Sequence, residues 1–137
     1  MTIHKIAIIG TGIMGMGIAQ IAAQAGVEVL LYDVKIGAAH NARHTLKQTL
    51  EKLTAKGKLT DAQLQSTLDN LIVTDELQQI AKTDAVIEAI IENLQAKQQL
   101  FAQLEAIVPA STILATNTSS LSVTAIAAEC QHPERVA

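Results

Sequence analysis

Short apolar runs alternate with longer amphipathic stretches along this chain, and the alternation predicts strands that alternate with helices. We expect strands at about residues 5–9, 27–32, 71–73, 85–89 and 112–115. We expect helices at about residues 14–25, 36–56, 60–70, 76–81, 94–108 and 123–128. This order is typical of right-handed crossovers between parallel strands, so it predicts an α/β fold with a doubly wound parallel sheet.

Two of the expected helices follow each other without an intervening strand and form an inserted helical hairpin. The first ends near Gly57, and Thr60 begins the second as an N-cap. Further along, residues 132–137 are expected to lead into another strand. Because a doubly wound dinucleotide fold usually has six strands, we expect residues 1–137 to form one domain that stops before its sixth strand.

The glycine run Gly10-Thr-Gly-Ile-Met-Gly15 follows the first expected strand directly and opens a helical pattern. In such a turn Gly10 permits the tight bend, Gly12 lets the backbone approach a phosphate, and Gly15 lets the helix pack on the strand. The same small residues could serve packing alone. Their place between a strand and a helix favours a site where a dinucleotide pyrophosphate meets a helix N-terminus.

Asp33 ends the second expected strand, at the spacing where a dinucleotide site has an acidic residue. Its carboxylate can accept hydrogen bonds from ribose hydroxyls and would repel a 2′-phosphate, so it favours NAD over NADP. Lys35 is near enough in sequence to offset that charge, and the alternative is a solvated loop aspartate. Asp33 and the glycine run together predict an NAD-binding Rossmann fold.

Two further polar groups follow the fourth and fifth expected strands, at the edge where open α/β sheets bind ligands. The first contains Glu92 and Lys97, which could equally be ordinary helix-start electrostatics, an acid in the first turn with a lysine about a turn later. The second contains Asn117 and Ser119, which stay open between a ligand role and a structural role. We expect the later serines of this second group to cap a helix.

Composition limits the classes of function. The hydrophobic fraction of 49% is enough for a globular core, and a net charge of −3 with interspersed signs argues against nucleic acid or anionic lipid as a partner. No apolar stretch has the length of a membrane span or the pattern of a leader. The lone Cys130 fits a reducing compartment, so we expect a cytoplasmic protein. The histidines have no metal-ligand spacing, and we expect no metal.

Three motifs follow one another along the chain: the glycine run with Asp33, the group with Glu92 and Lys97, and the group with Asn117 and Ser119. In this order they resemble the N-terminal NAD-binding domain of the 3-hydroxyacyl-CoA dehydrogenases. The resemblance spans essentially the whole chain and rests on residues 8–20, 86–94, 97–101 and 116–121. It implies that the pyrophosphate is wrapped by Gly10, Thr11, Gly12, Ile13, Met14 and Gly15. It also implies that Asp33 holds the adenosine ribose, and that Glu92 and Lys97 lie toward the nicotinamide half of the cofactor.

The resemblance implies substrate contacts as well. Ser119 would lie between the nicotinamide and the acyl-CoA carbonyl as a positioning residue that touches both. Thr49 and Lys56 fall on positions that contact the CoA moiety in relatives, and Asn117 is a further candidate for that contact. The implied reaction is the reversible oxidation of an L-3-hydroxyacyl-CoA to the 3-ketoacyl-CoA, with hydride passing to NAD.

The family's general-base histidine, its acidic partner and a helical dimerisation domain are expected beyond residue 137. We therefore expect this chain alone to bind NAD without useful turnover, and the full-length protein to be a homodimer. Two alternatives stay open. One is a stand-alone NAD-binding or sensing module without catalysis. The other is a related beta-hydroxyacid dehydrogenase with a different substrate, against which the block from Asn117 to Ser120 argues.

Overall fold

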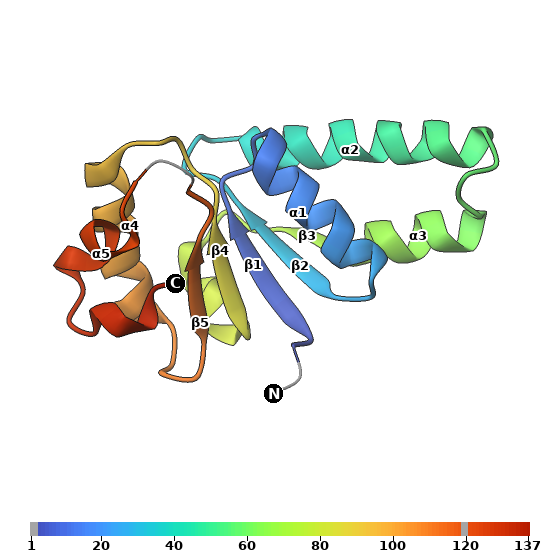
Figure 1. Ribbon diagram of the computed structural model, residues 1–137. Coiled ribbons are helices and arrows are strands. Elements are labelled where there is room, and N and C mark those ends of the chain that lie inside the picture. The colour runs from blue at the N-terminus through green and yellow to red at the C-terminus, as the bar shows by residue number, and fades with distance from the viewer. Residues whose placement is uncertain (1–2, 119–120) are drawn as a thin grey trace.

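The computed structural model describes residues 3–118 and 121–137, and it contains a five-stranded parallel sheet (Figure 1). The strands are β1 (Lys5–Ile9), β2 (Glu28–Tyr32), β3 (Leu71–Val73), β4 (Ala85–Glu88) and β5 (Ile113–Thr116). Their order across the sheet is β3-β2-β1-β4-β5, and every pairing is parallel. The predicted doubly wound α/β fold is therefore confirmed, with the order reversing between β1 and β4.

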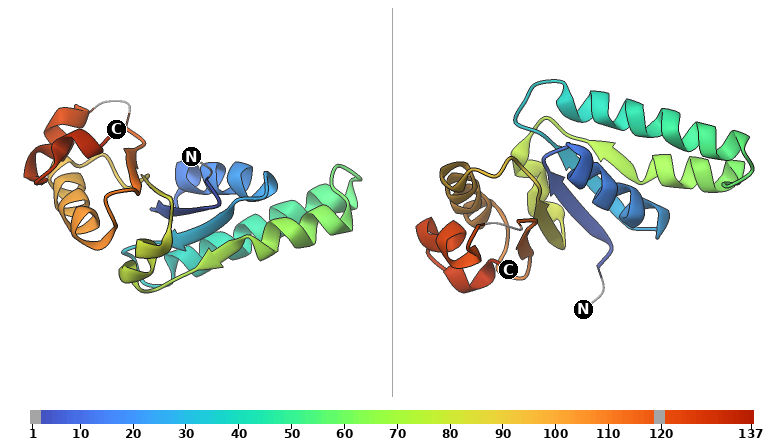
Figure 2. Two further views of the ribbon diagram at one scale, coloured as in Figure 1. Left: turned by 90° about the horizontal axis from the view of Figure 1, so that it is seen from below. Right: turned by 45° about the horizontal axis from the view of Figure 1, so that its top comes forward.

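Helices cover both faces of this sheet (Figure 2). They are α1 (Ile13–Gln24), α2 (Ala38–Ala55), α3 (Asp61–Asp69), α4 (Leu94–Ile107) and the short α5 (Val123–Ile126), with 3-10 turns η1 (Leu77–Lys82), η2 (Ala127–Glu129) and η3 (Pro133–Arg135). Each boundary falls within two residues of its prediction, except that the last expected helix divides into α5 and η2 and the expected helix at 76–81 is the 3-10 turn η1. Within residues 3–118 and 121–137, no helix combines the length and apolar character needed to cross a membrane.

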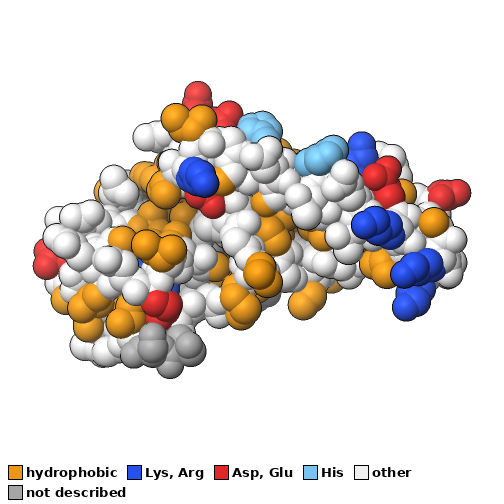
Figure 3. Space-filling model, turned by 90° about the horizontal axis from the view of Figure 1, so that it is seen from above, with side chains coloured by type: hydrophobic (Ala, Val, Ile, Leu, Met, Phe, Trp, Pro, Cys, Tyr) orange, Lys and Arg blue, Asp and Glu red, His pale blue; other side chains and the backbone are white. Residues whose placement is uncertain are grey.

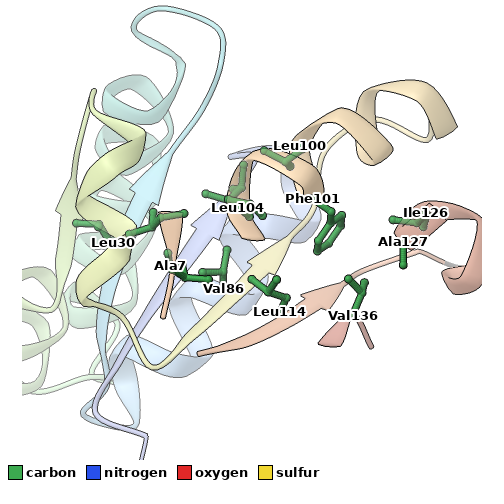
Figure 4. Close-up of a cluster of buried hydrophobic side chains, with 13 residues drawn as sticks. Ala7, Leu30, Val86, Leu100, Phe101, Leu104, Leu114, Ile126, Ala127 and Val136 are labelled. Carbon is green, nitrogen blue, oxygen red and sulfur yellow. The ribbon is translucent and has the colours of Figure 1, made fainter. Parts of the chain in front are cut away.

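The alternation of side chains along the central strands separates two apolar cores. Ile6 and Ile8 of β1 pack with α1, α2 and α3 on one face of the sheet. Ala7 and Ile9 point the other way and join a cluster beneath α4, η1 and α5, in which Phe101 has no exposed surface (Figure 4). A strand that is buried on both faces must be apolar throughout, which explains the continuous run at the start of the sequence.

The helical hairpin of α2 and α3 extends beyond the sheet, as Figure 1 shows. Gly57 ends the first arm with a φ of +75°, and Thr60 caps the second. The Thr60 hydroxyl accepts from the Gln63 N–H at 3.1 Å, and the Gln63 side chain accepts from the Thr60 N–H at 2.9 Å. The Arg43 guanidinium donates to carbonyls at the end of α3 and the start of β3, and so ties the hairpin to the sheet.

The last residues of the chain lie along the outer edge of β5. Val136 forms a parallel bridge with Leu114, and the Ala137 N–H donates to the Leu114 carbonyl at 3.0 Å. This pairing agrees with the expectation that residues 132–137 lead into a further strand, which stays a prediction. Ser122 caps α5 by accepting from the Ala125 N–H, which confirms a capping role among the later serines, whereas Ser120 lies outside the described residues.

Candidate functional site

The glycine run forms the turn from β1 into α1, at the carboxyl edge of the sheet. Gly10 has a φ of +103°, and a Cβ there would lie 2.6 Å from the Ala89 carbonyl oxygen of the neighbouring strand end. A Cβ on Gly15 would lie 2.0 Å from the Gly10 carbonyl oxygen. Both glycines are required by the close approach of the protein's own backbone, which agrees with the tight bend expected at Gly10 and the helix packing expected at Gly15.

Gly12 differs from these two glycines, because a Cβ built on it would meet no atom within 4 Å. Its φ of −74° is accessible to any residue, so packing within this chain gives no reason for a glycine here. Gly12 begins α1 without a side-chain cap, and the first helical turn holds no acidic residue. The first N–H groups of a helix lack partners within it. The open space at Gly12 therefore fits a pyrophosphate bound at the helix N-terminus.

Asp33 lies beside this turn, just beyond the end of β2. One of its carboxylate oxygens accepts from both the N–H and the hydroxyl of Thr11, at 2.8 and 2.7 Å, and the other accepts from the Lys35 N–H at 3.0 Å. Partial burial by itself raises the Asp33 pKa, but the hydrogen bonds from Lys35 and Thr11 outweigh it, and the pKa lies below its ordinary value. The carboxylate is ionised at neutral pH, and Thr11 orients it.

A cavity of about 570 Å³ lies between the glycine run, residues 33–35, residues 89–91 and the start of α4. Its walls combine apolar side chains such as Leu100 with the polar groups of Thr11 and Asp33, which is the usual make-up of a cofactor pocket. Figure 3 looks onto this edge of the molecule, where hydrophobic side chains gather around a hollow, and basic side chains cluster toward the end of the hairpin.

Lys97 forms the ion pair with Glu92 that the helix-start alternative predicts, and it also pairs with a second, buried carboxylate. Its side chain has no exposed surface, and its ammonium donates to both carboxylate oxygens of the equally buried Glu88, at 3.0 and 2.8 Å. Burial by itself lowers the Lys97 pKa, but the hydrogen bonds that its ammonium donates to Glu88 and Glu92 outweigh this effect, and the pKa lies above its ordinary value. Sequence reasoning missed Glu88 as a site residue, although an acid at the end of an apolar strand was a visible signal.

The two expected polar groups meet through Glu92. One carboxylate oxygen of Glu92 lies 2.8 Å from the Lys97 ammonium, and the other accepts from the Thr118 hydroxyl at 2.7 Å. Thr118 follows β5, beside Asn117, whose N–H donates to the Glu88 carbonyl. The structure thus joins the loops after β4 and β5. Ser119 lies outside the described residues.

The expected CoA contacts lie on α2. Thr49 is exposed and lines a groove of about 530 Å³ between α1 and α2, together with Gly12 and Ile13 of the glycine turn. This groove adjoins the cofactor cavity, because Thr11 and Gly12 line both. Lys56 is exposed at the C-cap of α2, beyond the groove, near the end of the hairpin.

His132 lies far from this edge of the sheet. Because Val136 pairs with Leu114 near the start of β5, the preceding His132 lies toward the opposite edge. Its imidazole is mostly exposed and 3.5 Å from the Glu134 carboxylate. His132 is not among the residues that border the cavity at the glycine turn.

The open glycine turn, the ionised carboxylate beside it and the parallel sheet define a dinucleotide-binding domain of the Rossmann class. Comparison with known proteins identifies the family. Residues 5–137 match the model described as "3-hydroxyacyl-CoA dehydrogenase, NAD binding domain". The chain belongs to the 3-hydroxyacyl-CoA dehydrogenase family, and its cofactor is NAD.

Individual relatives agree with this assignment. The chain is 46% identical over 135 residues to a 3-hydroxyadipyl-CoA dehydrogenase of Escherichia coli, and 44% identical over 136 residues to a probable 3-hydroxybutyryl-CoA dehydrogenase of Bacillus subtilis. These matches cover 98% and 99% of the chain but only 28% and 47% of the relatives. A crystal structure of 3-hydroxybutyryl-CoA dehydrogenase from E. coli superposes with a TM-score of 0.94 and 45% identity, covering 99% of this chain and 29% of that one.

Proposed function

We propose that this chain supplies the cofactor-binding part of an NAD-dependent 3-hydroxyacyl-CoA dehydrogenase, an enzyme that reversibly oxidises an L-3-hydroxyacyl-CoA to the 3-ketoacyl-CoA. The observation that carries the proposal is the open glycine turn next to the ionised Asp33, in a chain that matches the family's NAD-binding domain from residue 5 to 137. The family match supports a dehydrogenase over a stand-alone sensing module. It also supports an acyl-CoA over another beta-hydroxyacid as the substrate class.

In this proposal the cofactor crosses the carboxyl edge of the sheet. The backbone N–H groups of the exposed Ile13 and Met14, behind the open space at Gly12, hold the pyrophosphate. Asp33 accepts hydrogen bonds from the adenosine ribose hydroxyls. The other half of the cofactor then extends over the ends of β4 and β5, toward the half-exposed Glu92. Lys97 acts there through Glu92, because its own side chain is buried.

The groove between α1 and α2 is the proposed CoA site. It opens from the same glycine turn, and the Thr49 hydroxyl lies in its wall. Lys56, at the end of α2, offers a cation to a phosphate of the CoA moiety. Asn117 and Ser119, after β5, are the proposed contacts to the acyl end. The relatives described above from Escherichia coli and Bacillus subtilis are named for acyl-CoA substrates of this kind, 3-hydroxybutyryl-CoA and 3-hydroxyadipyl-CoA.

When bound, NAD would supply the acceptor for the hydride that leaves the carbinol carbon of the substrate. The chain's own contribution is orientation: the glycine turn and Asp33 fix one end of the cofactor, and Ser119 positions the substrate carbonyl against the other. The histidine that the resemblance places beyond residue 137 completes the proposal as the base for the hydroxyl proton. The proposal also includes a homodimer. It includes a cytoplasmic location as well, because the lone Cys130 fits a reducing compartment.

Two measurements test this function. In calorimetric titrations of the chain, NADH should bind and NADPH should bind at least about tenfold more weakly, because Asp33 meets the 2′-phosphate. The product of the complete reading frame should oxidise NADH in the presence of acetoacetyl-CoA, whereas the 137-residue chain should not do so at a useful rate. Absence of NADH binding, or equal affinity for both nucleotides, would contradict the proposal.

A further inference from the structure

A buried polar cluster lies away from Asp33 and the glycine turn. It is centred on Glu88, a residue without any exposed surface. Its carboxylate is saturated with donors. Lys97 donates to both oxygens, the Ile90 N–H donates to one at 2.7 Å, and the Thr116 hydroxyl donates to the other. Glu88 and Thr116 are register partners on the adjacent strands β4 and β5, so the contact is set by the sheet itself. A buried carboxylate with this many donors has one well-defined orientation.

The cluster reaches the surface through Lys97. The same ammonium that Glu88 holds also lies 2.8 Å from Glu92, whose side chain is 40% exposed. Glu92 in turn accepts from the Thr118 hydroxyl in the loop after β5. A continuous series of hydrogen bonds and ion pairs therefore runs from the buried end of β4 to the two loops over which the second half of the cofactor extends.

Charge explains why the buried end matters. Without Glu88, the Lys97 ammonium would keep a single carboxylate partner, Glu92, and would lose the two hydrogen bonds that hold it beneath the loop. A buried cation moves toward its remaining partner or toward water, because desolvation without full pairing is unfavourable. Glu92 and Thr118 would then lose the fixed position of the ammonium that links them to the sheet.

We propose that Glu88 is a positioning residue for the nicotinamide half of the NAD site, acting through Lys97 on Glu92 and Thr118. The inference rests on the proposed function, and it adds a residue that touches neither cofactor nor substrate. It also divides the site in two. The glycine turn and Asp33 hold the adenosine half independently, whereas the nicotinamide half depends on the cluster centred on Glu88.

Calorimetric titration of the chain with NADH and with ADP-ribose, which lacks the nicotinamide, tests this division. Glu88→Gln should weaken NADH by about tenfold, and it should leave ADP-ribose within about twofold of the wild type, because only the nicotinamide half loses its support. A general loss of structure would weaken both nucleotides by the same factor. That result, or an unchanged NADH affinity in a folded variant, would overturn the proposal.

Two further variants keep the test decisive. Thr118→Val removes the last hydroxyl of the series without disturbing the buried pair, so it should fold and weaken NADH selectively by about threefold. If Glu88→Gln does not fold, unchanged NADH affinity in Thr118→Val overturns the proposal.

Asp84→Asn is the matched control, since this carboxylate precedes β4 at the opposite edge of the sheet and accepts from the His4 and Lys5 N–H groups. It should leave both affinities within about twofold.

Failure of the underlying function would look different from failure of this inference. A wild-type chain that binds neither nucleotide would overturn the proposed function, and this inference with it. A wild-type chain that binds NADH more tightly than ADP-ribose, together with a Glu88→Gln variant that keeps the same ratio, would overturn the inference alone.

Discussion

Two carboxylates stand at the carboxyl ends of strands in the same sheet, and their surroundings differ. Asp33, after β2, is partly exposed and is held by neutral donors, the N–H and hydroxyl of Thr11 and the N–H of Lys35. Glu88, at the end of β4, has no exposed surface and forms an ion pair with the equally buried Lys97. Asp33 borders the cavity at the glycine turn, whereas Glu88 lies beneath the loops that border it.

The partners decide what each carboxylate can do. Neutral hydrogen-bond donors orient Asp33, the nearby Lys35 charge also lowers its pKa, and its carboxylate borders the cavity, where it can select between ligands. The Lys97 ammonium neutralises Glu88 inside the protein, so the effect of Glu88 is transmitted only through Lys97 and the groups that Lys97 holds. Two carboxylates at the same edge of one sheet thus have different roles. Asp33 recognises the ligand, and Glu88 positions other residues.

The largest effect should come from breaking the buried pair. Lys97→Met leaves the Glu88 carboxylate buried with only the Ile90 N–H and the Thr116 hydroxyl as donors. We expect a loss of about 3–5 kcal/mol in the free energy of unfolding, measured by urea denaturation. Lys52→Met, at an exposed position of α2, is the control and should change stability by less than about 0.5 kcal/mol. Equal effects of the two substitutions would contradict the buried pair.

At the adenosine end of the site, substitutions of Gly15 and Gly12 separate a packing role from a ligand-binding role. Gly15→Ala places a Cβ against the Gly10 carbonyl oxygen and should lower stability by about 2–3 kcal/mol, because backbone cannot move aside cheaply. Gly12→Ala meets nothing within 4 Å, so stability should fall by no more than about 1 kcal/mol, the ordinary cost of alanine at a helix N-cap. NADH affinity should nevertheless fall by about tenfold, since the new methyl occupies the phosphate approach. Thermal unfolding and calorimetry measure the two effects, and full NADH affinity in a folded Gly12→Ala variant would refute the phosphate site.

Asp33→Asn removes the charge that faces the cavity and keeps a side chain of the same shape. We expect the preference for NADH over NADPH to shrink by about tenfold, since repulsion of the 2′-phosphate is lost while a hydrogen-bond acceptor remains. The ratio of the two dissociation constants, measured by titration at low ionic strength, gives the result. Glu88→Gln should keep the wild-type preference for NADH over NADPH, because the Glu88 side chain does not contact the ribose. A ratio that Asp33→Asn leaves intact would remove Asp33 from cofactor selection.

The smallest effects should be the pH responses, which have opposite signs at the two ends of the site. The folded-state pKa of Asp33 is depressed, so its stabilisation is present above the ordinary value of 3.8 and is lost as pH falls through the folded-state pKa. The pKa of Lys97 is raised, so its stabilisation is present below 10.5 and is lost as pH rises through the folded-state pKa. The difference in unfolding free energy between wild type and Asp33→Asn should therefore shrink in acid, and that for Lys97→Met should shrink in alkali. A reversed sign at either end would contradict its hydrogen bonds.

The sequence by itself determined the class of fold and one end of the site. The apolar runs predict all five strands, and the central β1 is apolar almost throughout because it is buried on both faces. The glycine run and Asp33 could be assigned from spacing, since a turn between a strand and a helix is a local structure that a few residues specify. Thr60 as a helix cap is local in the same sense.

Only the tertiary structure decided the other end. The sequence places Lys97 in the first turns of a helix, where an ion pair with Glu92 is the ordinary expectation, and that pair forms. Burial of Lys97 depends on how α4 packs over β4, and the contact between Glu88 and Thr116 depends on the register of two strands that lie 28 residues apart in the chain. Long-range packing sets the exposure of a charged side chain, and exposure decides whether that charge meets a ligand or holds another residue in place.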